Sequence, residues 1–209
     1  MRHPSGSRAA GQCYHSRMNR DLDKMRRRPF FFPLVVPVLV FLGLVAAAAW
    51  LFDARATTVV FVVRHAETET GTDPDPGLSV DGRERAARLA KMLLQARTKE
   101  SGGPTPMRGL DAIFVSELRR TEQTAEPLAT PMGLSSNVIT SATWASLAGK
   151  IKREHRGEYV LAVGHSNTVP LLVEALSGEK VSVREDEYDA MFIVFVPQLS
   201  KAKVVRIRY

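Results

Sequence analysis

The longest apolar run of the chain lies close to its N-terminus. Residues 30–52, FFFPLVVPVLVFLGLVAAAAWLF, contain no charged side chain. A helix of this length is about 35 Å long, enough to cross the hydrocarbon core of a bilayer, which is about 30 Å thick. Pro33 and Pro37 lie near the start of the run, where a helix tolerates proline best. A buried helix of a soluble protein would show a polar face, so we expect residues 30–52 to form a transmembrane helix.

A long signal segment is the alternative interpretation of residues 30–52. The apolar part of a signal peptide usually has about 7–15 residues. The run at 30–52 is longer than that, which favours an uncleaved anchor. Residues 54–56, Ala-Arg-Ala, nevertheless form a plausible cleavage site, so both interpretations stay open. In either case the positive-inside rule predicts that the N-terminus is cytoplasmic and that residues 57–209 lie on the periplasmic or extracellular side.

Short apolar runs alternate with amphipathic segments throughout residues 57–209. Runs that are apolar on both faces are typical of buried parallel strands, and apolar positions three or four apart are typical of helices. The predicted strands are 57–63, 110–116, 137–140 (a weak candidate) and 159–164, with 190–196 and 203–209 as a closing hairpin or edge pair. The predicted helices are 79–96, with Ser79 as its N-cap, 118–129, 144–155 and 167–176; residues 100–109 are expected to form a loop. This alternation indicates a three-layer α/β sandwich with a mainly parallel sheet, preceded by one transmembrane helix.

Basic residues are concentrated outside this predicted domain. The chain has a net charge of +7, and residues 1–28 hold eight basic and two acidic side chains, so the remainder is nearly neutral. A nucleic-acid-binding protein usually carries its basic excess on the folded domain. We therefore expect residues 1–29 to be a disordered basic tail beside the membrane segment, with the membrane as a partner and no nucleic acid. Cys13 is the only cysteine, which excludes an intramolecular disulfide and a cysteine-based metal site.

Charged and imidazole side chains follow three of the predicted buried strands. Arg64 and His65 come directly after the strand predicted at 57–63. Arg120 lies just beyond the strand at 110–116, and His165 follows the strand at 159–164. Ligands of open α/β sheets bind outside the carboxyl ends of the strands, so we expect these four side chains to meet at one edge of the sheet.

These residue types suit the transfer of a phosphoryl group. Arg64 and Arg120 can each donate paired hydrogen bonds to phosphate oxygens. A neutral His65 can attack phosphorus, and a protonated His165 can stabilise the charge that builds on the other oxygens. The helix expected to start near Asn167 would add backbone N–H donors. The predicted substrate-binding residues are therefore Arg64, Arg120 and Asn167.

Three ordered motifs carry a resemblance to a known family. VVRHAET (62–68), SELRRTEQTA (116–125) and VGHSNT (163–168) resemble the histidine phosphatase superfamily, also called the phosphoglycerate mutase-like family. DPGLSVDGRERAARLA (75–90) is similar to the first loop and helix of that family, and the resemblance extends over about residues 57–196. It implies that His65 is the nucleophile, that Arg64 and Arg120 bind phosphate, and that His165 is the second catalytic histidine.

The sequence departs from the family pattern at two points. Ala66 stands where many members have glycine, and both residues are small. Many members also place a carboxylate between the second arginine and the second histidine as general acid, but residues 140–148, TSATWASLA, contain none. Glu67, Asp73, Asp75 or the EDEYD run at 185–189 could substitute, and the sequence leaves that choice open. Without a proton donor, we expect a preference for good leaving groups such as aryl phosphates, acyl phosphates and pyrophosphates.

The expected activity is a metal-independent phosphatase that hydrolyses a phosphate ester or anhydride through a phosphohistidine on His65, without a cofactor. Its substrate would be a phosphorylated small molecule or a phosphoprotein. The short segment between Arg120 and His165 leaves little room for a helical cap, which favours the compact phosphatases over a phosphoglycerate mutase-like phosphotransferase. A catalytically silent module that binds a phosphorylated ligand remains an alternative. A metal-dependent hydrolase is disfavoured, since Arg64 would lie beside the metal.

Overall fold

The computed structural model describes residues 32–98, 109–140 and 143–209. The predicted basic tail at 1–29 and most of the predicted loop at 100–109 lie outside these residues. The chain divides into two compact units, Met1–Trp50 and Leu51–Tyr209, and each is considered by itself.

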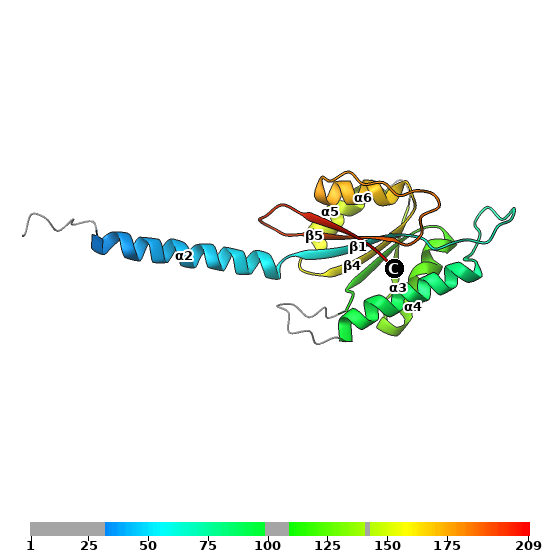
Figure 1. The fold of residues 1–209 in the computed structure, drawn as a ribbon, viewed down its shortest axis with the longest axis horizontal. Coiled ribbons are helices and arrows are strands. Elements are labelled where there is room, and N and C mark those ends of the chain that lie inside the picture. The colour runs from blue at the N-terminus through cyan, green and yellow to red at the C-terminus, as the bar shows by residue number, and fades with distance from the viewer. Residues whose placement is uncertain (1–31, 99–108, 141–142) are drawn as a thin grey trace, which may run out of the picture. The chain divides into compact units, whose positions relative to one another are not determined.

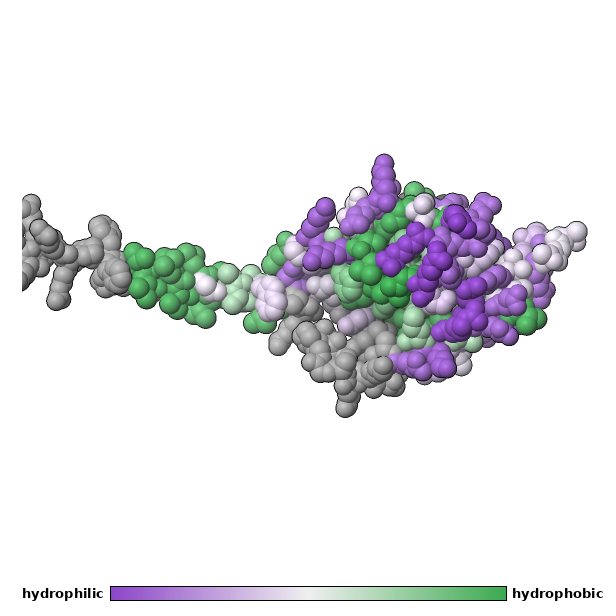
Figure 2. Space-filling view, viewed as in Figure 1, coloured by the Kyte–Doolittle hydropathy of each residue, from purple (hydrophilic) through white to green (hydrophobic). Residues whose placement is uncertain are grey.

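Helix α2 contains the apolar run and extends from Phe32 to Arg55. Its segment Val35–Asp53 has a mean hydropathy of 2.6 and is long and apolar enough to cross a membrane, by length and composition. Pro37 lies inside the helix, close to its start. Figures 1 and 2 show α2 as a single rod with apolar side chains along its surface. A signal sequence near the N-terminus can meet the same criteria of length and composition, so both sequence interpretations stay open.

The second unit is built on a six-stranded sheet with the strand order β3-β2-β4-β1-β5-β6 (Figure 1). Strands β1 to β4 run parallel to one another, whereas β5 is antiparallel to β1 and β6 is antiparallel to β5. The mainly parallel sheet and the closing edge pair are therefore confirmed. The strands are β1 (Thr58–Arg64), β2 (Ala112–Ser116), β3 (Ser136–Ile139), β4 (Tyr159–Gly164), β5 (Ala190–Val196) and β6 (Lys203–Arg208).

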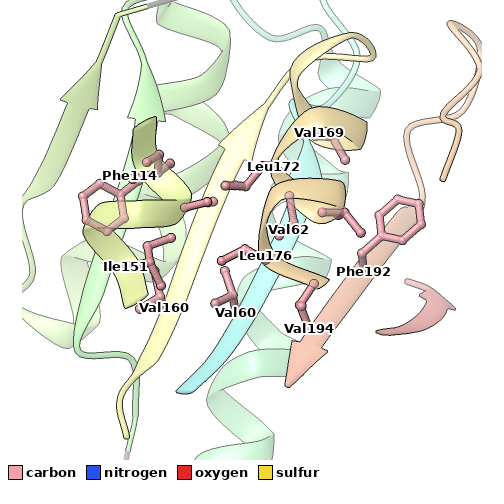
Figure 3. Packing of buried hydrophobic residues seen from close by; sticks show 14 of the residues in the cluster. Val60, Val62, Phe114, Ile151, Val160, Val169, Leu172, Leu176, Phe192 and Val194 are labelled. Carbon is pink, nitrogen blue, oxygen red and sulfur yellow. The ribbon is translucent and has the colours of Figure 1, made fainter. Parts of the chain in front are cut away.

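Helices cover both faces of this sheet, which confirms the three-layer sandwich. Alternate residues of β1 point to opposite faces, as the strand geometry requires. Val60 and Val62 pack in one apolar core with α5 (Trp144–Glu154) and α6 (Thr168–Ser177), and Figure 3 shows this core. Phe61 and Val63 belong to the other core, with α3 (Val80–Thr98) and α4 (Arg119–Met132).

The helix ends follow local chemistry. Helix α3 begins just after Ser79, whose hydroxyl oxygen accepts the Gly82 N–H at 3.1 Å, so the predicted N-cap is confirmed. Helix α4 continues to Met132, although residue 129 was its predicted end. Pro127 and Pro131 lie inside the helix, which ends at Gly133 with φ of 65°. Each proline removes only one N–H donor, and burial of the α4 residues Leu128 and Ala129 stabilises the extra turn.

Strand pairing brings the three predicted strand ends together. Strand β4 lies between β1 and β2, and all three run in the same direction. Arg64 at the end of β1 is level with Gly164 at the end of β4, and the His65 N–H donates to the Gly164 carbonyl at 2.9 Å. The residues after these strands therefore start from one edge of the sheet.

Candidate active site

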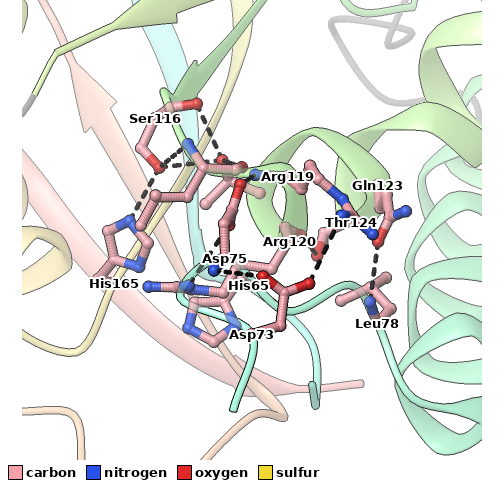
Figure 4. A network of polar contacts seen from close by, with 12 residues as sticks. His65, Asp73, Asp75, Leu78, Ser116, Arg119, Arg120, Gln123, Thr124 and His165 are labelled. Carbon is pink, nitrogen blue, oxygen red and sulfur yellow. Dashed lines mark hydrogen bonds and ion pairs between the residues drawn. The ribbon is translucent and has the colours of Figure 1, made fainter. Parts of the chain in front are cut away.

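Two histidine rings form the centre of the site at this edge. The centroids of the His65 and His165 rings lie 5.2 Å apart, with an angle of 62° between the ring planes. His65 follows β1 and His165 follows β4, so residues 100 positions apart in the sequence are brought together by strand pairing. Figure 4 shows both rings beside Arg120 and Ser116. The predicted meeting of the two imidazoles is thus present in the structure.

The contacts of His65 define which ring nitrogen is free. Its Nδ1 lies 2.7 Å from the Ala66 carbonyl oxygen, and a carbonyl can only accept a hydrogen bond. We infer that Nδ1 carries the proton and that Nε2 carries the lone pair. The Ala66 N–H in turn donates to the Thr124 hydroxyl of α4 at 3.0 Å, which holds this turn of backbone against the helix.

Burial lowers the pKa of His65 to about 3. Only 6% of the residue is exposed, and an apolar environment disfavours the charged ring. His165, Arg64 and Arg120 lower this pKa further, because a positive imidazole would lie beside other cationic groups. His65 is therefore neutral throughout the physiological pH range and can act as a nucleophile.

His165 is held by hydroxyl groups at the end of β2. Its Nε2 lies 2.8 Å from the Ser116 hydroxyl, which also lies 3.0 Å from the Thr121 hydroxyl. The Thr121 hydroxyl can donate to the Leu118 carbonyl at 2.7 Å, so one hydrogen-bonded chain can run from His165 through Ser116 and Thr121 to Leu118. In that chain His165 Nε2 is the donor, and its Nδ1 is left for the site.

The sequence suggested a protonated His165, and the free site does not support that state. Burial, followed by the charge of Arg120, lowers the pKa of His165 to about 4. The carboxylates of Glu117 and Asp75 act in the opposite direction without reversing the shift. The ring is consequently neutral until an anion enters the site.

Backbone and packing contacts position the segment that follows β4. The His165 N–H donates to the Thr168 hydroxyl at 2.8 Å, and the Trp144 indole N–H donates to the Thr168 carbonyl at 3.0 Å. Asn167 is the exposed N-cap of α6, and its side chain makes no capping hydrogen bond. The predicted helix start is therefore present next to His165, while a ligand role for Asn167 remains a prediction.

The two arginines enter the site differently. Arg64 is 8% exposed and is held by the segment at 184–188, where its guanidinium donates to the Arg184 carbonyl at 3.0 Å. Arg120 lies on the first turn of α4, with its guanidinium 3.7 Å from the Asp75 carboxylate. Its side chain is 20% exposed, whereas that of Arg119 is 58% exposed and pairs with Asp73 at 3.7 Å. Arg120 is thus the inward residue of the pair.

Residues 60–147 match the family model of the histidine phosphatase superfamily, branch 1. This match includes the Arg64-His65 and Arg120 motifs. This part of the chain is therefore similar to the histidine phosphatase superfamily. The sheet order and the strand-end position of both histidines agree with this similarity.

Solved structures of similar fold include several phosphatases. The protein histidine phosphatase SixA, in complex with tungstate, is 18% identical with a TM-score of 0.54, over 72% of this chain and 96% of that chain. A candidate alpha-ribazole-5'-P phosphatase from Escherichia coli K-12 is 16% identical with a TM-score of 0.53, over 73% of this chain and 96% of that chain. A mycobacterial glucosyl-3-phosphoglycerate phosphatase is 15% identical with a TM-score of 0.51, over 73% of this chain and 98% of that chain. These likenesses establish the fold. No curated protein matches the chain.

The carboxylates that the sequence offered as general acids occupy different environments. Glu67 forms a paired contact with Arg85, with Arg85 Nε 2.8 Å from both carboxylate oxygens. In the run at 185–189, Asp186 pairs with Arg184, and the buried Glu187 pairs with Arg206. These pairs stabilise the ionised carboxylates, whose pKa values are held below their usual range.

Asp75 is the candidate carboxylate that pairs with Arg120. One oxygen is buried and faces Arg120 at 3.7 Å, while the other accepts the Arg119 backbone N–H at 3.1 Å (Figure 4). Its negative charge also acts on His165. Sequence reasoning offered Asp75 only as one of several possibilities, because nothing in the local pattern shows which loop folds back onto Arg120.

Three site residues were not assigned a role from the sequence. Ser116 begins the motif at 116–125, but its contact with His165 depends on strand pairing. Glu117 follows it and acts electrostatically on His165. Tyr188 was noted only within the EDEYD run, yet its ring centroid lies 5.9 Å from that of His65. Among the described residues, no group of three or more His, Cys, Asp or Glu side chains is arranged to hold a metal ion.

Proposed function

We propose that this protein is a phosphatase that hydrolyses a phosphate ester or anhydride through a phosphohistidine on His65. The observation that carries the proposal is the neutral His65 ring, with Nδ1 bonded to a carbonyl and Nε2 free, beside a second histidine. A buried, uncharged imidazole surrounded by cationic groups is suited to attack a phosphoryl dianion. The family-model match over residues 60–147 and the phosphatases of similar fold support the same activity.

Phosphate binding would use the charges that surround the two rings. Arg64 and Arg120 supply guanidinium donors, and the first turn of α6 beyond Asn167 supplies backbone N–H groups. A bound dianion would favour protonation of His165, because its two negative charges outweigh the effect of Arg120. His165 is then a donor to the phosphoryl oxygens in the complex, although it is neutral in the free site.

The reaction has two displacements. In the first, the Nε2 lone pair of His65 forms a bond to phosphorus, and the bond to the leaving-group oxygen breaks with its electrons on that oxygen. The positive charge that develops on the ring is stabilised by the Ala66 carbonyl, which accepts from Nδ1. In the second, the oxygen of a water molecule forms a bond to phosphorus, the P–N bond breaks, and its electrons return to Nε2. The proton that the water loses passes to solvent, from which the leaving-group oxygen takes up the proton it needs. Inorganic phosphate is released.

The leaving group receives limited help from the protein. Asp75 faces Arg120, and ionised Glu67 pairs with Arg85, so neither is arranged as a ready proton donor. We therefore propose substrates with good leaving groups, either phosphorylated small molecules or phosphoproteins. The proteins of similar fold include a protein histidine phosphatase and a glucosyl-3-phosphoglycerate phosphatase, which act on these two kinds of substrate.

The same arrangement supports the proposal that the reaction needs no metal ion. Two guanidinium groups and a histidine can neutralise the phosphoryl charge without a divalent cation or another cofactor. Activity that is unchanged by EDTA would support this part of the proposal. Activity that disappears with EDTA and returns with added metal would contradict it.

We further propose that residues 30–52 anchor the protein, with residues 1–29 as a cytoplasmic tail and residues 57–209 as a periplasmic or extracellular catalytic domain. Cys13 provides a test because it is the only cysteine. A membrane-impermeant maleimide applied to intact cells should not label the natural chain. It should label a C13S chain in which Ser200→Cys supplies the only thiol. Labelling of Cys13 from outside would reverse the proposed orientation.

The nucleophile is tested by intact mass during turnover. The full chain in detergent is mixed with p-nitrophenyl phosphate and quenched in denaturant at alkaline pH, which preserves phosphohistidine. We expect one added phosphoryl group, absent in His65→Ala, and release of inorganic phosphate. Binding without turnover would instead identify a silent phosphate-binding module, and transfer of the phosphoryl group to a second substrate would identify a phosphotransferase.

A further inference from the structure

Arg64 is tied down on one side of its guanidinium by the segment before β5. Its Nη1 donates to the Arg184 carbonyl at 3.0 Å and also to the Glu185 carbonyl. Nη1 has two hydrogens, so both are used by the backbone of this segment. Nη1 therefore has no hydrogen left for a substrate in this arrangement.

Tyr188 contacts the same guanidinium through its ring and its hydroxyl. The Arg64 Cζ atom lies 4.1 Å from the ring centroid, within the range of a cation–π contact. Arg64 Nη2 also lies 3.4 Å from the Tyr188 hydroxyl oxygen, which can accept from it. Tyr188 thus restricts rotation of the planar Arg64 guanidinium.

Of the other Arg64 donors, Nη2 contacts the Tyr188 hydroxyl and Nε contacts no acceptor among the described residues. This Nε atom is buried. A buried N–H without an acceptor is costly, so this donor indicates that an acceptor is present when the site is occupied. Nε and Nη2 lie on the same side of the guanidinium and form a fork that fits two oxygens of one phosphoryl group.

The Tyr188 hydroxyl has a donor of its own that is directed to no described residue. In its contact with Arg64 Nη2 the oxygen accepts, and no acceptor for the hydroxyl hydrogen is present in residues 32–98, 109–140 and 143–209. The ring is half-buried, and its centroid lies 5.9 Å from that of the nucleophile His65. A phosphoryl group bound between Arg64 and His65 would lie within reach of this hydrogen.

We propose that Tyr188 is a further phosphate-contacting residue, whose hydroxyl donates to the bound phosphoryl group and whose ring holds Arg64 with its Nε and Nη2 donors toward that group. This inference rests on the phosphatase proposal for the identity of the ligand. It adds a residue outside the motifs that carry the family resemblance. The proposal also gives a role to the backbone carbonyls that accept from Arg64 Nη1. These carbonyls orient the guanidinium, and its Nε and Nη2 donors bind the phosphoryl group.

Two substitutions separate the hydroxyl from the ring. Tyr188→Phe removes only the hydroxyl, and Tyr188→Leu removes the stacking surface as well. Tyr159→Phe is the matched control, since Tyr159 is also half-buried but lies at the start of β4, at the opposite end of the strand from the site. Binding of tungstate, a tetrahedral dianion, is measured by calorimetry on the full chain in detergent, together with kcat and KM for p-nitrophenyl phosphate.

We expect Tyr188→Phe to weaken tungstate binding by about tenfold, the usual effect of losing one hydrogen bond to a charged group. Tyr188→Leu should weaken it by about another tenfold, because Arg64 loses its cation–π partner. For both variants kcat/KM should fall by the same factor as the tungstate affinity, a correspondence that a purely structural role would not produce. Tyr159→Phe should leave both quantities unchanged.

Unchanged tungstate affinity in Tyr188→Phe would overturn the hydroxyl contact, and equal affinities in the Phe and Leu variants would overturn the role of the ring. Thermal unfolding accompanies each variant; if Tyr188→Leu does not fold, Tyr188→Phe, which keeps the ring, still decides the hydroxyl contact. The natural chain in the same preparation is tested for phosphohistidine. Tungstate binding that depends on Tyr188 without phosphohistidine would refute the phosphatase proposal while leaving the Tyr188 contact in place.

Discussion

Acid should destabilise the folded domain through His65. The pKa of this ring is about 3 in the folded protein, compared with 6.5 for an unperturbed histidine. Between these two values the unfolded chain binds a proton that the folded chain does not, so lowering the pH favours unfolding. The two pKa values give a loss of about 2 kcal/mol between pH 7 and pH 5, most of it below pH 6.5.

The magnitude can be isolated by comparing the natural chain with His65→Asn. Urea unfolding of the full chain in detergent is followed by the fluorescence of the buried Trp144, in a Trp50→Phe background that removes the other tryptophan. The natural chain should lose about 2 kcal/mol more than the variant when the pH falls from 7 to 5. His165, whose pKa is also lowered, is present in both chains, so its contribution cancels to first order.

An equal loss of unfolding free energy in the two chains would refute this reasoning. It would mean that His65 takes up its proton as readily in the folded state as in the unfolded state. The site would then lack the buried, neutral nucleophile on which the proposed mechanism depends. A larger loss in the variant than in the natural chain would have the same meaning.

Three other predictions concern the site and its support. Ser116→Ala should lower kcat/KM by about tenfold, because His165 loses its hydroxyl partner at 2.8 Å, and Ser116→Thr should restore part of it; steady-state kinetics measures both. Gly164→Ala should destabilise the fold by about 2–3 kcal/mol in urea unfolding, since a Cβ there would lie 2.7 Å from the Thr168 hydroxyl and from the Trp144 ring. The kcat/KM for p-nitrophenyl phosphate should exceed that for a simple alkyl phosphate by about 100-fold, and equal values would show that the protein supplies an effective proton donor.

The sheet and the meeting of the histidines could be predicted because both depend on simple patterns. The segments ending at Arg64 and at Gly164 are apolar on both faces. This pattern is typical of a strand that is covered by other elements on both faces. Parallel strands end at the same edge, so Arg64, His65 and His165 were expected to be neighbours before any contact was known. The structure places them there.

The finer contacts could not be predicted because they depend on loops that fold back from distant positions. Asp75 reaches Arg120 across 45 positions of sequence, and Tyr188 reaches Arg64 across 124. No periodic pattern encodes such pairings. The charge state of His165 was misjudged for a related reason: its burial, which determines the pKa, is a property of the packed structure.

The position of β4 has a consequence for how the protein is made. The strands that carry His65 and lead to Arg120 do not pair with each other, because β4 lies between them. A growing chain that ends before Tyr159 already contains Arg64, His65 and Arg120, but it lacks the strand that joins them. Such fragments cannot complete the proposed phosphate site, because its residues meet only after β4 has inserted between β1 and β2. Appearance of enzymatic activity would therefore report that the whole sheet has closed, not merely that the motifs have been synthesised.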